Sequence, residues 1–264
     1  MPEFPVDGPV TVAFKIPSGS VDVVAEERAT AAVEVLPANG REESRRLAEE
    51  TTVEFHGDTL AVTAPDRYGF RLRSGSLAVK VRVPVGSSVS GKVASADTAC
   101  HGTFGGVSVE SASGDVQVDH VSGDAAFTTA SGDVRLGRVD GHLRSKGASG
   151  DLRAQRVSGT VGVKVASGDV DLEDVGGDVN LDTASGDVTI GRAANGTVRI
   201  GSASGDVRVG VVAGTGVWFD LKTLSGDTRN RLDTRAPAGT AEDDGNHLTL
   251  QIRTLSGDIF IHRA

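Results

Sequence analysis

Glycine recurs at every ninth position along the middle of this chain, and this spacing limits the fold more than any other feature of the sequence. The series runs without a slip from Gly105 to Gly186 and continues at Gly196 and Gly205 after one inserted residue. A typical unit is Ser131-Gly132-Asp133-Val134-Arg135-Leu136, with apolar residues two apart after the turn. A period of two predicts a strand with one buried face, and regularly spaced glycine predicts tight turns between strands. The repeat therefore predicts a β-solenoid from about Ser111 to Asp227.

The true period is eighteen residues, because alternate units differ. The residue two places before the glycine alternates between small and large, as at Ala112, Val121, Ala130 and Val139. One edge keeps the Ser-Gly-Asp corner on every coil, at Asp115, Asp133, Asp151, Asp169, Asp187, Asp206 and Asp227. The opposite, lax edge varies, with Asp124, His142, Thr160, Asp178 and Thr197. Two strands and two unlike corners per coil predict a flattened roll of two facing parallel sheets, with about 18 residues per coil.

Each residue of the strict corner suits a sharp reversal of the chain. Glycine supplies a positive φ, and the Asp carboxylate and Ser hydroxyl can accept hydrogen bonds from turn amides. Stacked carboxylates would repel one another unless backbone donors hold each of them. We therefore expect the aspartates of the strict edge to form a structural corner ladder bonded to backbone amides.

The flanks use a less regular form of the same pattern. Residues 1–92 are expected to form a β-rich cap continuous with the solenoid, with a degenerate corner at Ser18-Gly19-Ser20. The charged segment 41–50 predicts the one short helix, lying on the surface. The regular solenoid is expected at 93–227, followed at 228–264 by a polar loop excursion and C-terminal strands that finish the last coil.

Composition and charge exclude several classes of protein. The net charge of −9 argues against a nucleic-acid binder, which needs a basic face, and Cys100 is the only cysteine, so no disulfide framework can form. The chain shows neither a secretory signal nor an apolar run of the ~20 residues that span a bilayer. We therefore expect a cytoplasmic protein without a transmembrane segment.

These features together resemble a bacterial family of β-strand-repeat proteins regarded as adhesins or as a domain of unknown function. The resemblance rests on the Val21-Asp22-Val23 strand after Ser18-Gly19, the charged helix, the step Val83-Pro84-Val85-Gly86, the serial Ser-Gly-Asp-Val units and the closing Thr254-Leu255-Ser256-Gly257-Asp258. It implies an all-β fold, a single-stranded right-handed β-solenoid. It also implies that some members are anchored at the membrane or linked to envelope-stress signalling, and it brings no catalytic residues.

Three chemical alternatives compete with these structural interpretations. Calcium-binding rolls use Gly-Gly-x-Gly-x-Asp, whereas these corners usually have one glycine followed directly by Asp, so backbone capping is favoured. A glycan-cleaving β-helix needs two carboxylates in unlike environments, which a regular ladder does not offer. Cys100 and His101 are adjacent on a strand and should point to opposite faces, so no nucleophile–base dyad is expected. No catalytic, cofactor-binding or metal-binding residue is predicted.

Two surface features remain as candidates for partner contact. Outward arginines, among them Arg135, Arg153 and Arg208, form a partial basic stripe, and Trp218 falls at an outward position beside inward Phe219. We therefore interpret the chain as a non-catalytic, adhesin-like scaffold for an unknown protein or glycan partner. A self-assembling rod like the bactofilins is the alternative, and a glycan-active β-helix enzyme is a lesser one.

Overall fold

The computed structural model describes residues 2–65, 75–232 and 247–264. The chain divides into two compact units, Met1–Arg135 and Leu136–Ala264. No helix among the described residues is long and apolar enough to cross a membrane. The elements of the first unit are β1 (Glu3–Pro5), β2 (Thr11–Glu26), β3 (Thr30–Pro37), α1 (Glu42–Glu50), β4 (Thr52–His56), β5 (Thr59–Thr63), β6 (Leu77–Pro84), β7 (Ser88–Phe104), β8 (Gly106–Ser111), β9 (Val116–Val121) and β10 (Ala125–Thr129).

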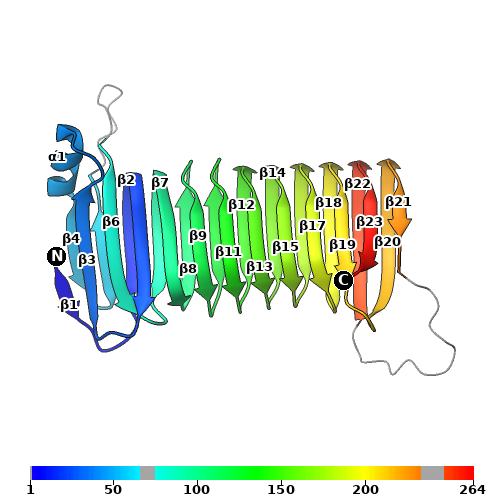
Figure 1. The fold of residues 1–264 in the computed structure, drawn as a ribbon, viewed down its shortest axis with the longest axis horizontal. Coiled ribbons are helices and arrows are strands. Elements are labelled where there is room, and N and C mark those ends of the chain that lie inside the picture. Colours follow the sequence, from blue (N-terminus) through cyan, green and yellow to red (C-terminus); the bar gives the residue numbers. More distant parts are fainter. Residues whose placement is uncertain (1, 66–74, 233–246) are drawn as a thin grey trace. The chain divides into compact units, whose positions relative to one another are not determined.

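In the described part of the second unit every helix or strand element is a short strand, and Figure 1 shows these strands lying side by side. Strand β11 (Val134–Val139) begins at the boundary between the units. It is followed by β12 (Leu143–Ser149), β13 (Leu152–Val157), β14 (Val161–Ser167), β15 (Val170–Val175), β16 (Val179–Ser185), β17 (Val188–Ala193), β18 (Gly196–Ser204), β19 (Val207–Val211), β20 (Gly216–Ser225), β21 (Thr228–Asn230), β22 (His247–Ser256) and β23 (Ile259–Arg263).

The register of the second unit confirms the eighteen-residue coil. Strand β13 pairs in parallel with β15, with Leu152 opposite Val170, and β15 pairs in the same way with β17. The intervening strands β12, β14 and β16 make a second parallel set. Each coil therefore contributes one strand to each of two sheets. Side chains of alternate residues, such as Val170 and Leu172, are buried between the sheets, which is the expected consequence of a period of two.

The first unit already contains this coil in its opening strand. Strand β2 pairs in parallel with β7 from Thr11 opposite Ser88 to Val24 opposite His101, so it follows both sheets of one coil. The degenerate corner lies in register with the strict edge, because Ser20 is opposite Asp97. The cap adds antiparallel pairs, β1 with β3, β3 with β6 and β4 with β5. The predicted surface helix is confirmed as α1, with most of its side chains exposed.

The C-terminal strands do not finish the last coil, which corrects the expectation from the sequence. Strand β22 pairs in parallel with β18 on one side and with β20 on the other, and β23 lies likewise between β19 and β21. The terminal coil of this unit is therefore β20–β21, although β22–β23 come later in the chain (Figure 1). The inward residues of β22 and β23 are more apolar than those of β20 and β21. They are Leu248, Leu250, Ile252, Ile259 and Ile261, each at most 1% exposed. The more apolar of these two coils thus takes the inner position. Of the predicted excursion, residues 233–246 lie outside the described residues.

Candidate interaction surface

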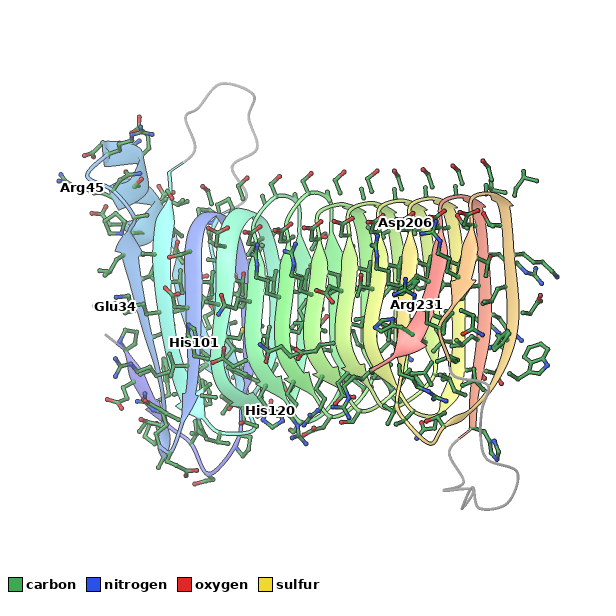
Figure 2. The ribbon with its side chains drawn as sticks, turned by 45° about the vertical axis from the view of Figure 1, so that its right-hand side comes forward. Glu34, Arg45, His101, His120, Asp206 and Arg231 are labelled. Atoms are coloured by element: carbon green, nitrogen blue, oxygen red, sulfur yellow. The ribbon has the colours of Figure 1, made fainter. Side chains whose placement is uncertain are left out.

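The strict edge is a ladder in which each coil's carboxylate accepts the backbone N–H of the next coil's aspartate. In the first unit, the amides of Asp115 and Asp133 donate to Oδ1 of Asp97 and Asp115, at 3.0 and 2.9 Å. In the second unit the carboxylates of Asp151, Asp169, Asp187, Asp206 and Asp258 accept the amides of Asp169, Asp187, Asp206, Asp258 and Asp227 in turn, at 2.8 to 3.0 Å. Figure 2 shows Asp206 in this row of corners.

Two members of the ladder were absent from the set predicted from the sequence. Asp258 carries the same Ser-Gly-Asp motif and lies between Asp206 and Asp227 in space, because β22–β23 are inserted there. Asp97 follows Ser95-Ala96 without a glycine, so only its spacing of eighteen residues from Asp115 could have identified it.

The glycines of these corners are required by the close approach of neighbouring coils as well as by conformation. Gly186 has φ 132°, a value that L residues rarely adopt, and a Cβ there would collide with the carbonyl oxygen of Gly168. In the first unit Gly114 lies outside this positive-φ region, yet its Cβ would collide with the carbonyl oxygen of Ala96. The predicted role of positive φ therefore holds for Gly186, whereas for Gly114 glycine is selected by space alone.

Arg135, Arg153 and Arg208 pair with this ladder, so these three do not form a free basic stripe. Each guanidinium contacts the aspartate two residues before it: Arg135 reaches Asp133 at 2.7 Å, Arg153 reaches Asp151 at 2.8 Å and Arg208 reaches Asp206 at 2.9 Å. Arg135 and Arg208 also approach the preceding coil's carboxylate, on Asp115 and Asp187, at 3.4 and 3.3 Å. Within Asp-Val-Arg, the arginine side chain thus links its own coil to the preceding one, although exposed ion pairs of this kind contribute little to stability.

The lax edge uses the same hydrogen bond with different acceptors. The Thr160 amide donates to Nδ1 of His142 at 3.0 Å, and the Thr197 amide donates to Oδ1 of Asp178 at 2.7 Å. The corner therefore requires an acceptor, which an imidazole can supply as well as a carboxylate.

We expect Asp169→Ala to lower the free energy of unfolding by about 1 kcal/mol, because the Asp187 amide loses its acceptor. Asp169→Asn is the matched control, since its side-chain oxygen can still accept that amide. Residue 171, two places further on, is aspartate, so no Asp-Val-Arg pair is lost at this corner. Urea unfolding of the three proteins measures the difference, and equal midpoints for Ala and Asn would show that the amide bond is not what the corner requires.

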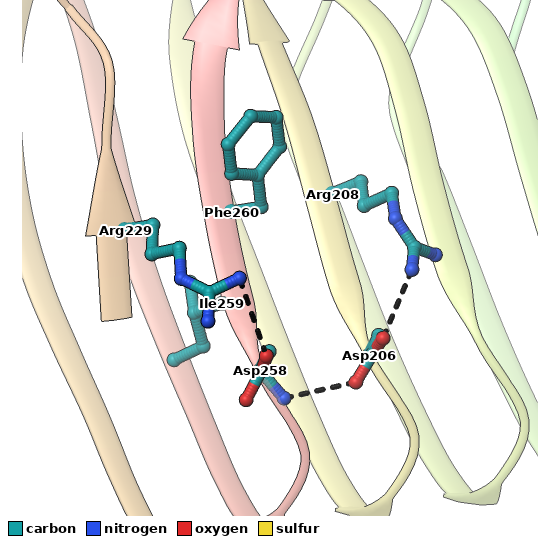
Figure 3. Close-up of a pocket in the computed structure, with 6 residues that line it drawn as sticks. All are labelled: Asp206, Arg208, Arg229, Asp258, Ile259 and Phe260. Carbon is teal, nitrogen blue, oxygen red and sulfur yellow. Dashed lines mark hydrogen bonds and ion pairs between the residues drawn. The ribbon is translucent and has the colours of Figure 1, made fainter. Parts of the chain in front are cut away.

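A polar hollow of about 200 Å³ lies between two arginines in the last coils of the second unit. Phe260 lies opposite Arg208 on one side and Arg229 on the other, at the position that holds arginine in both neighbours. Arg229 contacts Asp227 at 3.0 Å and approaches Asp258 at 3.9 Å. Figure 3 shows the lining residues: Asp206, Arg208, Arg229, Asp258, Ile259 and Phe260. The hollow therefore combines an aromatic ring with two guanidinium groups and two carboxylates.

The Phe260 ring has neighbours of its own beside the hollow. The guanidinium carbon of Arg231 lies 5.2 Å from the ring centroid, and the His262 ring stacks at 5.4 Å. These contacts hold the ring in place at the surface, where it is half-buried. The sequence signal for this site was one aromatic residue in a column that holds arginine on some coils and Asp171 or Thr189 on others, and the sequence-based predictions did not include it.

Exposed apolar side chains gather on the strands of the last two coils. Trp218 is 59% exposed on β20, which agrees with its predicted outward position, and its neighbour Phe219 is 43% exposed. Leu224 and Leu255, which face outward before the corners of β20 and β22, are 83% and 59% exposed. All four of these exposed apolar residues therefore lie on the last two coils of the second unit, three facing outward and Phe219 facing inward.

Cys100 is buried, and burial raises the pKa of its thiol to about 12, with smaller contributions from the charges of Asp119 and Asp22. Its neighbour His101 instead meets the carboxylate of Asp119, with Nδ1 3.2 Å from Oδ2. A thiol with this pKa stays protonated at neutral pH and is a poor nucleophile. Among the described residues no group of three or more His, Cys, Asp or Glu side chains is placed to hold a metal ion.

Comparison with known proteins identifies the fold. A structure described as a "putative adhesin" of Parabacteroides merdae has a TM-score of 0.50 at 11% identity, over 98% of this chain and 94% of that one. Another "putative adhesin", from Parabacteroides distasonis, has a TM-score of 0.51 at 12% identity, over 98% and 95%. At these identities the likeness shows the fold alone, and no curated protein matches the chain.

A family model matches almost the whole chain and settles its family. That model, described as Toastrack DUF4097, covers residues 12–262, so it includes both units of the structure. The resemblance to an adhesin-like repeat family is thereby confirmed. The chain belongs to the Toastrack DUF4097 family.

Proposed function

We propose that this chain is a non-catalytic, adhesin-like scaffold that binds a glycan of the cell envelope at the hollow around Phe260. The observation that carries the proposal is the replacement of arginine by Phe260 between Arg208 and Arg229. An aromatic ring can pack against the apolar face of a sugar, and flanking guanidinium and carboxylate groups can bond its hydroxyls. The likeness to structures described as putative adhesins supports a binding role of this kind.

The carboxylates of the hollow support binding rather than hydrolysis. Asp206 and Asp258 each use Oδ1 to accept a backbone amide, and each has an arginine beside Oδ2. A glycosidase needs one carboxyl group that holds its proton and another that stays ionised, and therefore needs two unlike environments. Asp206 and Asp258 have similar ones.

The test is binding of the purified chain to an array of envelope glycans, followed by titration of the best ligand. Phe260→Arg should weaken binding by about tenfold or more, because it removes the ring and adds a third guanidinium group to the hollow. Thr189→Arg is the matched control, since it adds arginine in the same column on β17, outside the hollow. Unchanged binding by Phe260→Arg would rule out the hollow. No bound glycan would overturn the adhesin-like function, and release of reducing sugars would overturn the non-catalytic one.

A further inference from the structure

Strand β20 presents an open edge and an uncovered interior at the end of the second unit. It pairs with β22 on one side, and no strand within the described ranges pairs with its other side. Its inward Phe219 is 43% exposed, whereas Leu250, opposite it on β22, is fully buried. An open edge beside uncovered apolar side chains favours the addition of another strand.

The outward face of β20 is also unusual. The column that holds Ala184 and Ala203 on inner coils continues as Leu255 and then Leu224 on the last two. Trp218 lies on the same face, and between Trp218 and Leu224 stand one acidic and one basic residue, Asp220 and Lys222. Large apolar side chains therefore flank a pair of opposite charges along one exposed strand.

We propose that two copies of this chain pair through β20, antiparallel and centred on Leu221. In this register Asp220 lies opposite the partner's Lys222, and Trp218 lies opposite the partner's Leu224. The mirrored pairs repeat both contacts, so the charges and the apolar residues are each matched twice. On the inward face, Leu221 meets the partner's Leu221 and the two open interiors close over each other.

The alternation of inward and outward side chains along β20 allows few registers for this pairing. Outward residues are even-numbered and inward residues odd-numbered, and a slip of one residue would turn the inward face of one copy outward. The inward faces of both copies therefore stay on the same side only in registers that differ by steps of two. Centring the pair on Asp220 would place that carboxylate opposite its own copy, and centring it on Lys222 would oppose two ammonium groups. Of these three neighbouring registers, only the one centred on Leu221 places unlike charges opposite each other.

A two-fold interface of this kind closes on itself. Both copies use the same strand, so the contact is isologous and ends at a dimer. The proposal therefore differs from a growing filament, and it does not depend on the glycan site proposed above.

Sedimentation equilibrium of the full chain should give a mass of twice 27.0 kDa. The chain has a single tryptophan, so its emission reports on Trp218 alone and should shift to the blue as the dimer forms. Asp220→Lys and Lys222→Asp each place like charges opposite one another. Each variant alone should dimerise about tenfold more weakly or worse. An equimolar mixture of the two should dimerise again, because each altered residue then faces an opposite charge.

The controls separate the interface from the fold. Asp220 also contacts Lys222 and Arg253 of its own chain, at 3.2 and 3.7 Å, so thermal unfolding of each variant must be compared with the parent. Asp182→Lys is the matched charge reversal on β16, an inner strand of the same sheet, and should leave the dimer unchanged. A mixture that stays monomeric would overturn the register. A parent chain that is monomeric at every concentration would overturn the dimer. Growth into filaments would overturn the two-fold, self-closing interface.

Discussion

Replacing Gly186 by alanine is expected to lower the free energy of unfolding by about 3 kcal/mol or more. Two independent effects combine at this corner. The φ of 132° is strained for any residue with a Cβ, and the new Cβ would collide with the carbonyl oxygen of Gly168 in the preceding coil. Because the obstacle is the backbone directly before Asp169, whose carboxylate accepts the Asp187 amide, it cannot move without disturbing the neighbouring corner. Urea or thermal unfolding measures the loss.

The control for this prediction is Gly162→Ala. Gly162 lies on β14, has no positive φ, and an added Cβ would meet only the Leu143 carbonyl oxygen, at 4.0 Å. Its stability should change by less than about 0.5 kcal/mol. If both variants unfolded at the same denaturant concentration, the corner glycine would have no special role and the account of the ladder would be wrong.

Leu172→Ala should lower the free energy of unfolding by about 2 to 5 kcal/mol. Leu172 is fully buried between the two sheets, and Ala154 and Ile190 lie at the same position in the neighbouring coils. The small Ala154 cannot fill the space that the lost leucine leaves, so a cavity should remain. The same unfolding measurement gives the magnitude.

The adjacent substitution Asp171→Ala is the matched control, because Asp171 is exposed on the opposite face of the same strand. It should change stability by less than about 0.5 kcal/mol. A large effect at Asp171 together with a small one at Leu172 would mean that the faces of β15 are reversed.

The sequence predicts the coil because its signals are local. A glycine at every ninth position and apolar residues two apart require contacts only between neighbouring turns and between the two sheets of one coil. The same locality made Asp115, Asp133 and their successors recognisable as one column. The short helix α1 was predictable for a similar reason, since its charged run and the preceding Asn39-Gly40 act within one segment.

The candidate hollow could not be predicted in this way. It depends on Phe260 lying between Arg208 and Arg229, which are respectively 52 residues earlier and 31 residues earlier in the chain. The motifs Thr223-Leu224-Ser225-Gly226-Asp227 and Thr254-Leu255-Ser256-Gly257-Asp258 are identical in sequence. The two motifs themselves therefore do not show which of them stacks on Asp206.

The sequence alone thus determined the eighteen-residue period, the buried face of each strand and the composition of both corners. Tertiary structure decided the order of the last coils and the pairing of the outward arginines. It also decided that β20 ends the stack with Trp218, Phe219 and Leu224 exposed. The physical reason is that each coil can stack on any coil of the same shape, so the pattern fixes the unit but not its neighbours. Burial then selects the arrangement, and here it places the leucines and isoleucines of β22–β23 inside and leaves β20 at the end.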